Sequence, residues 1–134
     1  MIRYLLDAAT VAAAVQGRLP VVLRLSRLKP GEVAVSAVSK MQVEVALRRA
    51  PRAQPRYSRL LRDFFEAVRV LDFRAEDAGQ LVGLAPYLPQ DAGSPSAYEL
   101  LLAATALSHR LTLVTDTPQR FAFVPGLEAE SWAK

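Results

Sequence analysis

Short apolar runs alternate with longer amphipathic segments along the chain, and this alternation predicts strands and helices in turn. The apolar runs are short and rich in leucine and β-branched valine, which favours buried strands. We predict strands at 2–6, 33–38, 70–73 and 111–114, and a last short strand near 128–132.

The segments between these runs have helical character. The stretch 58–68 repeats its apolar residues on one helical face, and 100–107 is apolar almost all round, which is typical of a buried helix. Ser39 with Gln42, and Ser96 with Glu99, fit the capping-box pattern that opens a helix. We predict helices at 10–16, 20–27, 39–49, 58–68, 75–84 and 96–107, with proline-containing loops at 50–56 and 86–95.

Alternating strands and helices favour a parallel sheet covered by helices on both faces. The fold class expected is therefore α/β, a three-layer α/β/α arrangement around a central parallel sheet of four to five strands. The chain of 134 residues fits one domain, 1–134, because two domains would each be too small for a good core. Its hydrophobic fraction of 51% is enough to build that core.

The composition limits the chemistry. With no cysteine and a single histidine, His109, the chain offers no thiolate site and no site that needs two imidazoles. Carboxylates are plentiful, so a bound metal would be a hard cation such as Mg²⁺ or Mn²⁺. No apolar run reaches the roughly 18 residues of a membrane span, and Asp7 lies where a signal peptide would be apolar. We expect a cytoplasmic protein without membrane contact.

Three acids are predicted near one edge of the sheet. Asp7 ends the first strand, Asp116 lies just past the fourth, and Glu99 is in the first turn of the helix that leads into the fourth strand. Ligands of open parallel sheets bind outside the carboxyl ends of the strands. Carboxylates gathered there repel one another and are stabilised by a divalent cation, as in metal-assisted hydrolysis of phosphodiesters.

Each acid also has a purely structural interpretation. Asp7 can cap the turn that follows it, Glu99 suits the third position of a capping box, and Asp116 before a Thr-Pro pair is a common turn residue. For Glu99 and Asp116 taken singly, the structural interpretation is favoured. The three acids at one sheet edge support a functional site more strongly than any one of them.

The net charge of +4 only permits an anionic partner, but its distribution is uneven. Six arginines and no acid lie between residues 48 and 62. Arginine pairs well with phosphate, so the stretch is a candidate nucleic-acid-binding surface. It can equally be an ordinary solvated surface or contact an acidic protein segment. The arginines predicted to contact nucleic acid are Arg48, Arg49, Arg52 and Arg56.

Several segments together resemble the PIN domains of VapC-type toxins. The YLLD sequence at 4–7 resembles their opening strand and first metal-binding acid, and VSAVS at 35–39 resembles their second strand and helix entry. The segment 96–107 resembles their long buried helix, 111–116 their strand ending in threonine and a polar residue, and 121–132 their usual ending. The match covers essentially the whole chain in the expected order.

The resemblance implies an endoribonuclease that depends on Mg²⁺ or Mn²⁺ and hydrolyses RNA phosphodiester bonds. Such proteins are usually the toxin of a toxin–antitoxin pair, and so the resemblance implies an antitoxin protein partner and a homodimer. Carried over by position, Asp7, Glu99 and Asp116 would be metal ligands. Gln42 lies at the position of the family's second acid and completes the implied catalytic set.

The chain departs from the family pattern at this site. Ala8 and Ala9 stand where the family usually has a hydroxyl and an amide, and Gln42 brings no charge where the family has Glu. Glu99 is one methylene longer than the usual Asp. Two hypotheses follow: a working but weak nuclease, or a non-catalytic module that keeps a surface for RNA or for an antitoxin-like partner. A Rossmann-type nucleotide site is set aside, because no glycine follows the first strand.

Overall fold

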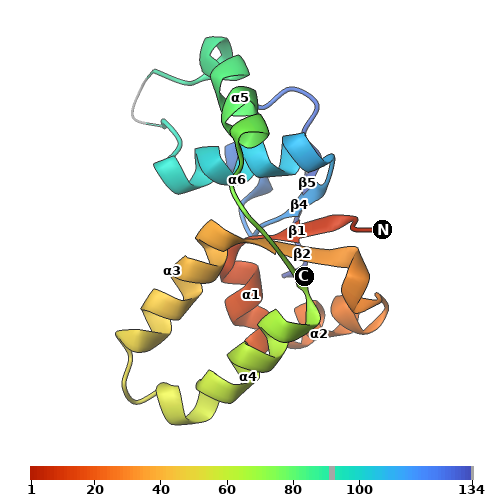
Figure 1. The fold of residues 1–134 in the computed structure, drawn as a ribbon, viewed down its shortest axis with the longest axis vertical. Coiled ribbons are helices and arrows are strands. Elements are labelled where there is room, and N and C mark those ends of the chain that lie inside the picture. Colours follow the sequence, from red (N-terminus) through yellow and green to blue (C-terminus); the bar gives the residue numbers. More distant parts are fainter. Residues whose placement is uncertain (91–92, 134) are drawn as a thin grey trace.

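The computed structural model describes residues 1–90 and 93–133, and its centre is a sheet of five parallel strands (Figure 1). The order across the sheet is β3-β2-β1-β4-β5, with every neighbouring pair parallel. The strands are β1 (Tyr4–Leu6), β2 (Val33–Ser36), β3 (Arg69–Leu71), β4 (Thr112–Val114) and β5 (Ala129–Glu130). The predicted α/β class and parallel sheet are confirmed, and all the predicted strands are present, including the last one.

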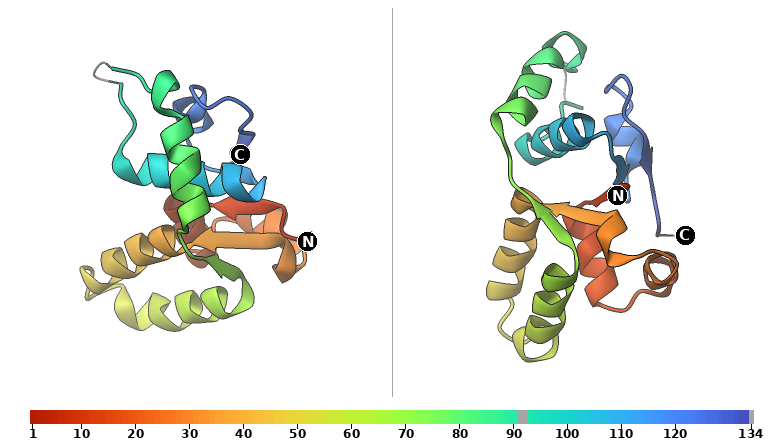
Figure 2. Two further views of the ribbon diagram at one scale, coloured as in Figure 1. Left: turned by 45° about the horizontal axis from the view of Figure 1, so that its top comes forward. Right: turned by 45° about the vertical axis from the view of Figure 1, so that its right-hand side comes forward.

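Helices cover both faces of the sheet, as predicted. Figures 1 and 2 show the first four helices on one face and the last two on the other. The first group is α1 (Ala8–Val15), α2 (Leu19–Ser26), α3 (Ala37–Arg48) and α4 (Gln54–Ala67). The second group is α5 (Ala75–Gly83) and α6 (Ala97–His109), and three short 3-10 helices join the elements: η1 (Pro30–Glu32), η2 (Ala85–Tyr87) and η3 (Pro118–Phe121).

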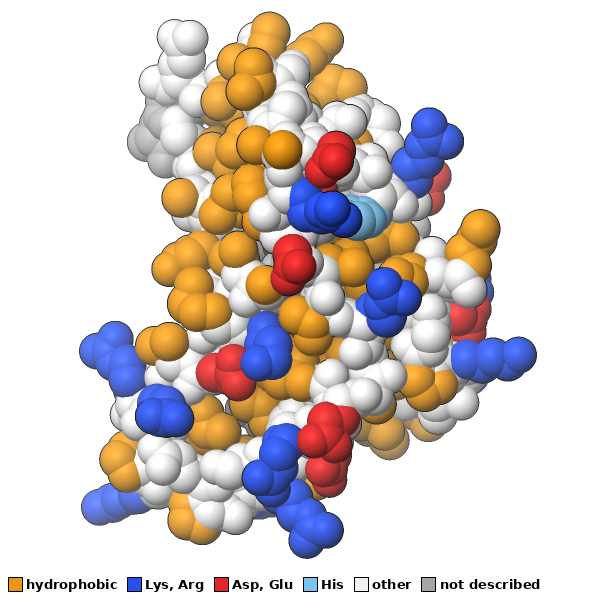
Figure 3. Space-filling model, in the orientation of Figure 1, with side chains coloured by type: hydrophobic (Ala, Val, Ile, Leu, Met, Phe, Trp, Pro, Cys, Tyr) orange, Lys and Arg blue, Asp and Glu red, His pale blue; other side chains and the backbone are white. Residues whose placement is uncertain are grey.

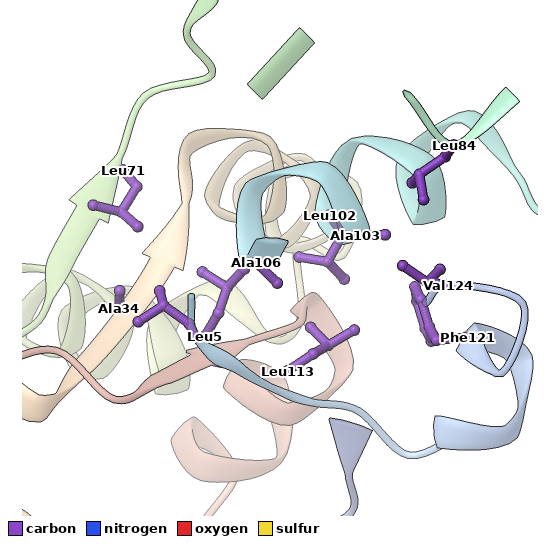
Figure 4. Close-up of a cluster of buried hydrophobic side chains, with 11 residues drawn as sticks. Leu5, Ala34, Leu71, Leu84, Leu102, Ala103, Ala106, Leu113, Phe121 and Val124 are labelled. Carbon is purple, nitrogen blue, oxygen red and sulfur yellow. The ribbon is translucent and has the colours of Figure 1, made fainter. Parts of the chain in front are cut away.

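Each face of the sheet has its own apolar core. Leu5 and Leu113, both fully buried, point toward α5 and α6, where they pack with Ala103 of α6 and Phe121 of η3 (Figure 4). Leu6 joins the core on the opposite face, under the first four helices. Successive strand residues point to opposite faces, so a strand as short as β1 contributes to both cores.

The start of α3 differs from the prediction. The strand β2 ends at Ser36 rather than at 38, and Ser36 is the N-cap of α3, accepting a hydrogen bond from the backbone N–H of Ser39 at 2.9 Å. The predicted capping box of Ser39 and Gln42 is therefore wrong. Two serines three residues apart both suit an N-cap, and the pairing of β2 with β1 and β3 decides which one ends the strand.

The helix α4 begins earlier than predicted, so part of the predicted loop at 50–56 is helical. Gln54 opens the helix and Pro55 follows in its first turn, where proline costs no hydrogen bond. The Gln54 side-chain amide donates to the carbonyl oxygens of Leu47 and Arg48, which ties the start of α4 to the end of α3. In the predicted loop at 86–95, residues 91 and 92 lie outside the described residues.

Within the described ranges 1–90 and 93–133, no single helix has the length and hydropathy needed to cross a membrane. The consecutive helices α1 and α2 pass that test only as a pair, and they are bent by 92° relative to each other.

Candidate active site at the carboxyl edge of the sheet

The register of the sheet places Asp7 at the junction of three strands. Leu6 pairs with Val35 of β2 and with Val114 of β4. The next residue, Asp7, donates its backbone N–H to the Val114 carbonyl at 3.0 Å. Because parallel strands run in step, the residues that follow these partners, Ser36 and Thr115, flank Asp7 on either side. Both are buried.

The Asp7 carboxylate caps α1 and is partly buried. One oxygen accepts a hydrogen bond from the backbone N–H of Thr10 at 2.8 Å. Burial raises the pKa of Asp7, and hydrogen bonds from Thr10 and Thr115 lower it in part. The negative charge of Asp116 raises this pKa further, so the two carboxylates lie near enough to repel each other. The net shift of the Asp7 pKa is upward.

Asp116 lies in the turn after β4 and is exposed. Its neighbours form a small hydroxyl network, in which the Thr115 hydroxyl accepts a hydrogen bond from the Thr117 backbone N–H at 3.3 Å. The Thr10 hydroxyl, from the start of α1, donates to the Val114 carbonyl at 3.3 Å. These contacts tie the loop that carries Asp116 to the helix that Asp7 caps.

Glu99 is held by a different partner. It completes the predicted capping box of α6: the Ser96 backbone N–H donates to Glu99 Oε1 at 2.8 Å, and the Ser96 hydroxyl accepts from the Glu99 N–H. Arg120 of η3 donates hydrogen bonds to both carboxylate oxygens of Glu99, from Nε at 2.5 Å and from a terminal nitrogen at 2.8 Å. The Arg120 guanidinium lowers the pKa of Glu99 to about 2.

The predicted acids therefore do not form one cluster. The negative charge of Asp116 acts on Asp7, whereas Glu99 is paired with Arg120. The helix α6 begins two residues before Glu99, on the side of the sheet where β1 and β2 end (Figures 1 and 2). Gln42 is half-buried in α3 and has no capping role. Within residues 1–90 and 93–133, no three acidic or imidazole side chains are arranged to hold a metal ion together.

The four arginines predicted to bind nucleic acid are all exposed and lie around the turn between α3 and α4. Figure 3 shows Lys and Arg side chains spread over the end of the molecule that these helices form in Figure 1. Arg48 lies eleven residues beyond Ala37, so the helix rise places it roughly 16 Å from the start of α3. A cleft of about 870 Å³ lies between the two helices, and the residues that line it include Arg48, Arg49, Arg62, Leu61 and Phe65.

The low pKa of Glu99 predicts an acid-dependent loss of stability. A carboxyl whose folded pKa is about 2 instead of 4.5 stabilises the fold above about 4.5, and loses that contribution as the pH falls toward 2. Because the ion pair is partly exposed to solvent, we expect a contribution of about 1 kcal/mol. Urea unfolding at about pH 5 and about pH 2.5 should show a smaller stability loss in Glu99→Gln than in the unsubstituted chain. Equal losses in both proteins would contradict the assignment.

Comparison with known proteins gives structural matches only. The DNA-bound VapBC structure from Salmonella typhimurium matches with a TM-score of 0.85 and 21% identity, over 98% of this chain and 99% of that one. The DNA-bound VapBC2 structure from Rickettsia felis matches with a TM-score of 0.84 and 22% identity over the same shares. VapBC-1 from nontypeable Haemophilus influenzae matches with a TM-score of 0.72 and 23% identity over 100% of both chains. No family model and no curated protein sequence matches.

These likenesses define the class of fold: a three-layer α/β/α domain of the kind found in VapBC toxin–antitoxin complexes. The resemblance to VapC-like PIN domains is thereby confirmed for the fold, over nearly the whole chain. At 21–23% identity, the matches do not carry the site chemistry of those proteins to this chain.

The sequence did not predict Arg120 as a site residue, although its ion pair with Glu99 changes what that carboxylate can bind. Arg120 was not singled out, because nothing in its local sequence distinguishes it from other exposed arginines. Its partner is 21 residues away, and the contact exists only once η3 folds back over the start of α6. Thr115 and Ser36 are also missed as neighbours of Asp7. Their position just after two predicted strands was the available signal.

Proposed function

We propose that this chain is a weak endoribonuclease of the VapC toxin type, which hydrolyses RNA phosphodiester bonds with Mg²⁺ or Mn²⁺. The observation that carries the proposal is the partly buried Asp7 at the carboxyl edge of the sheet, whose pKa is raised mainly by burial and further by the negative charge of Asp116. A divalent cation bound between two carboxylates relieves their mutual repulsion and so lowers the free energy of the site.

The donor set fits a cation held by two carboxylates. Mg²⁺ in proteins commonly binds through one or two carboxylates and keeps several waters, and Asp7 and Asp116 supply that number. Glu99 is occupied by Arg120, and Gln42 brings no charge, so we expect low affinity. The cation, when bound, would polarise the scissile phosphate and lower the pKa of the attacking water.

The protein's own side chains have separate roles in this proposal. Thr10 and Thr115 hydrogen-bond to the Asp7 carboxyl and fix its orientation. Asp116 is exposed and so meets RNA at the surface. The exposed arginines of the α3–α4 turn would bind the RNA backbone at some distance from the cut, because arginine pairs with phosphate through two parallel hydrogen bonds.

We also propose an antitoxin-like protein as the partner. The VapBC structures that share this fold are toxin–antitoxin complexes. Several large apolar side chains are exposed on α2 and α3, which both contact α1 on the first face, and this supports contact with a protein segment. They are Leu19, Val22 and Leu23 of α2 and Met41 and Val45 of α3. Homodimer formation, which the resemblance implies, stays a prediction.

The test is RNA cleavage with a matched pair of carboxylate variants. We expect slow cleavage of unstructured RNA in Mg²⁺ or Mn²⁺, none with a chelator, and a loss of about 100-fold or more in Asp116→Asn, because a metal ligand is removed. Asp63→Asn, which removes an exposed acid from α4, should keep the activity. Cleavage that persists with the chelator, or that is equal in the two variants, would refute the proposal.

The second candidate is a non-catalytic module that binds RNA or an antitoxin-like partner. The contact that favours it is the ion pair between Arg120 and Glu99, because it engages one of the three side chains that the resemblance implies as metal ligands. Under this proposal the chain binds RNA in gel-shift measurements and does not cleave it in Mg²⁺ or Mn²⁺. RNA binding would then weaken in Arg48→Gln and remain unchanged in Asp116→Asn.

A further inference from the structure

The helices α3 and α4 form a hairpin (Figures 1 and 2), and contacts at its two ends frame the cleft between them. At the turn, the Gln54 side-chain amide donates to the carbonyl oxygens of Leu47 and Arg48 at 3.2 and 3.0 Å. At the end next to the sheet, the Lys40 ammonium of α3 lies 5.3 Å from the centre of the Phe65 ring of α4. The volume of about 870 Å³ between these contacts is therefore present before any partner binds.

Apolar side chains line this cleft on both helices. Met41 and Val45 of α3 are 42% and 46% exposed, whereas Leu61 and Phe65 of α4 are buried. Large exposed apolar side chains that gather at one concave surface mark a binding site, because covering them removes hydrocarbon from water. The cleft therefore suits an occupant that brings apolar side chains of its own.

The charged side chains along the cleft are predominantly basic. Three arginines line it and form no ion pair with residues 1–90 or 93–133: Arg48, Arg49 and Arg62. Of the two acids that also line it, Glu44 is paired with Lys40 at 3.0 Å, which leaves Glu66 against the three arginines. Two of these arginines lie at the C-terminal end of α3, beside the turn. Charge complementarity thus calls for carboxylates at the turn end of the occupant.

RNA suits the cleft less well than a protein segment does. Single-stranded RNA is held by stacking its bases on aromatic rings, and Phe65, the aromatic residue that lines the cleft, is buried and covered by Lys40. An RNA backbone would pair with the arginines but leave Met41 and Val45 uncovered. A protein helix with an apolar face and an acidic end satisfies both requirements.

We propose that the α3–α4 cleft binds an amphipathic helix of a protein partner, with Asp or Glu at the end of that helix beside the turn. Between Lys40 and Arg48, α3 rises about 12 Å, roughly two helical turns. Apolar side chains spaced i, i+3 or i+4 and i+7 on the partner helix cover that length. This inference deepens the proposed contact with a protein partner and rests on it, but it requires neither a divalent cation nor RNA cleavage.

The experiment measures binding of labelled synthetic peptides to the full chain by fluorescence anisotropy. The probe is an amphipathic helix of about four turns, with leucines on one face and glutamates in its first turn, where the helix dipole favours them. Val45→Asp should weaken its binding about 10-fold or more, because a charge then faces the leucines. Val82→Asp changes an apolar side chain of α5 that is 74% exposed and should leave the affinity unchanged.

A second pair of variants tests the charge complementarity. A peptide with lysines in place of the glutamates should bind about 10-fold more weakly or worse, because like charges then meet. Arg48→Gln/Arg49→Gln should weaken the glutamate peptide and narrow its advantage over the lysine peptide. Arg18→Gln/Arg27→Gln removes the same charge from the two exposed ends of α2 and should change neither affinity. Circular dichroism of each variant verifies that the fold is intact.

Several outcomes would overturn the inference. One is equal binding of a peptide with the same composition but its leucines out of helical register, and another is unchanged binding in Val45→Asp. Loss of a labelled oligoribonucleotide in Val45→Asp without peptide binding would assign the cleft to RNA, and dissociation of a dimer in that variant without peptide binding would assign it to a second copy of the chain. If RNA cleavage is observed and lost in Asp116→Asn while no peptide binds, the docking inference is overturned and the proposed nuclease stands.

Discussion

Replacing Trp132 by alanine is expected to lower the free energy of unfolding by about 3–5 kcal/mol, the usual cost of deleting a buried aromatic side chain. Trp132 is 1% exposed and meets the ring of Tyr4 edge-on, with ring centres 5.2 Å apart. Its indole N–H donates to Glu130 Oε2 at 2.8 Å, and Arg24 of α2 lies over its ring at 5.1 Å. The side chain thus holds the end of the chain against β1 and α2.

Urea unfolding followed by circular dichroism would measure this effect, because Trp132 is the single tryptophan and its removal abolishes the fluorescence signal. Trp132→Phe retains a ring but not the N–H, so it should cost clearly less than alanine. The pair of variants separates packing from the hydrogen bond to Glu130. A loss below about 1 kcal/mol for Trp132→Ala would be typical of an exposed position, and would show that the tail is not docked as the structure has it.

Replacing Asp7 by asparagine is expected to stabilise the metal-free protein and to weaken the proposed binding of a divalent cation. The folded pKa of Asp7 is raised, mainly by burial, so its ionisation costs more in the folded chain than in the unfolded chain. Stability therefore falls as the pH rises from the ordinary pKa of 3.8 through the raised value. Asparagine carries no charge and caps a helix as well as aspartate does, so the hydrogen bond from Thr10 is kept.

Thermal unfolding near neutral pH should show a higher melting temperature for Asp7→Asn, and the difference should shrink below pH 3.8, where both side chains are neutral. In the same variant, Mn²⁺ binding and RNA cleavage should fall by more than the roughly 10- to 100-fold typical of losing a residue that merely supports a metal ligand. Asp63→Asn is the matched control for both measurements. A lower melting temperature in Asp7→Asn would contradict the burial of an ionised Asp7, and unchanged Mn²⁺ affinity would contradict its role as a ligand.

Opposite directions for these two effects would support the proposed role of Asp7 in binding a cation. A residue kept for stability alone would not carry a buried charge next to a second negative charge. The same reasoning separates Asp7 from Glu99, whose charge is stabilised by Arg120 and whose pKa is lowered to about 2. In the metal-free chain, the negative charge of Asp7 is destabilised by burial, and that of Glu99 is stabilised by its ion pair with Arg120.

Much of the fold was predictable because its signals are local. Leu5 and Leu6 lie in an apolar run short enough to be a strand, and Ser96 with Glu99 opens a helix through contacts three residues apart. The positions of Asp7 and Asp116 at the edge of the sheet were predictable for the same reason, since each follows a strand directly or within two residues. Where local signals were ambiguous, as with Ser36 and Ser39, the boundary depended on strand pairing and the prediction was wrong.

The sequence by itself determined the alternation of strands and helices, the parallel sheet, and the presence of acids just beyond two of its strands, because periodicity and capping act over a few residues. The tertiary structure decided which of those acids face each other. The strand order β3-β2-β1-β4-β5 brings Asp7 beside Thr115 from across the chain, and the fold of η3 brings Arg120 onto Glu99. The physical reason is that electrostatic interactions depend on distance in space, and residues far apart in the chain approach one another only when the sheet and its helices have packed.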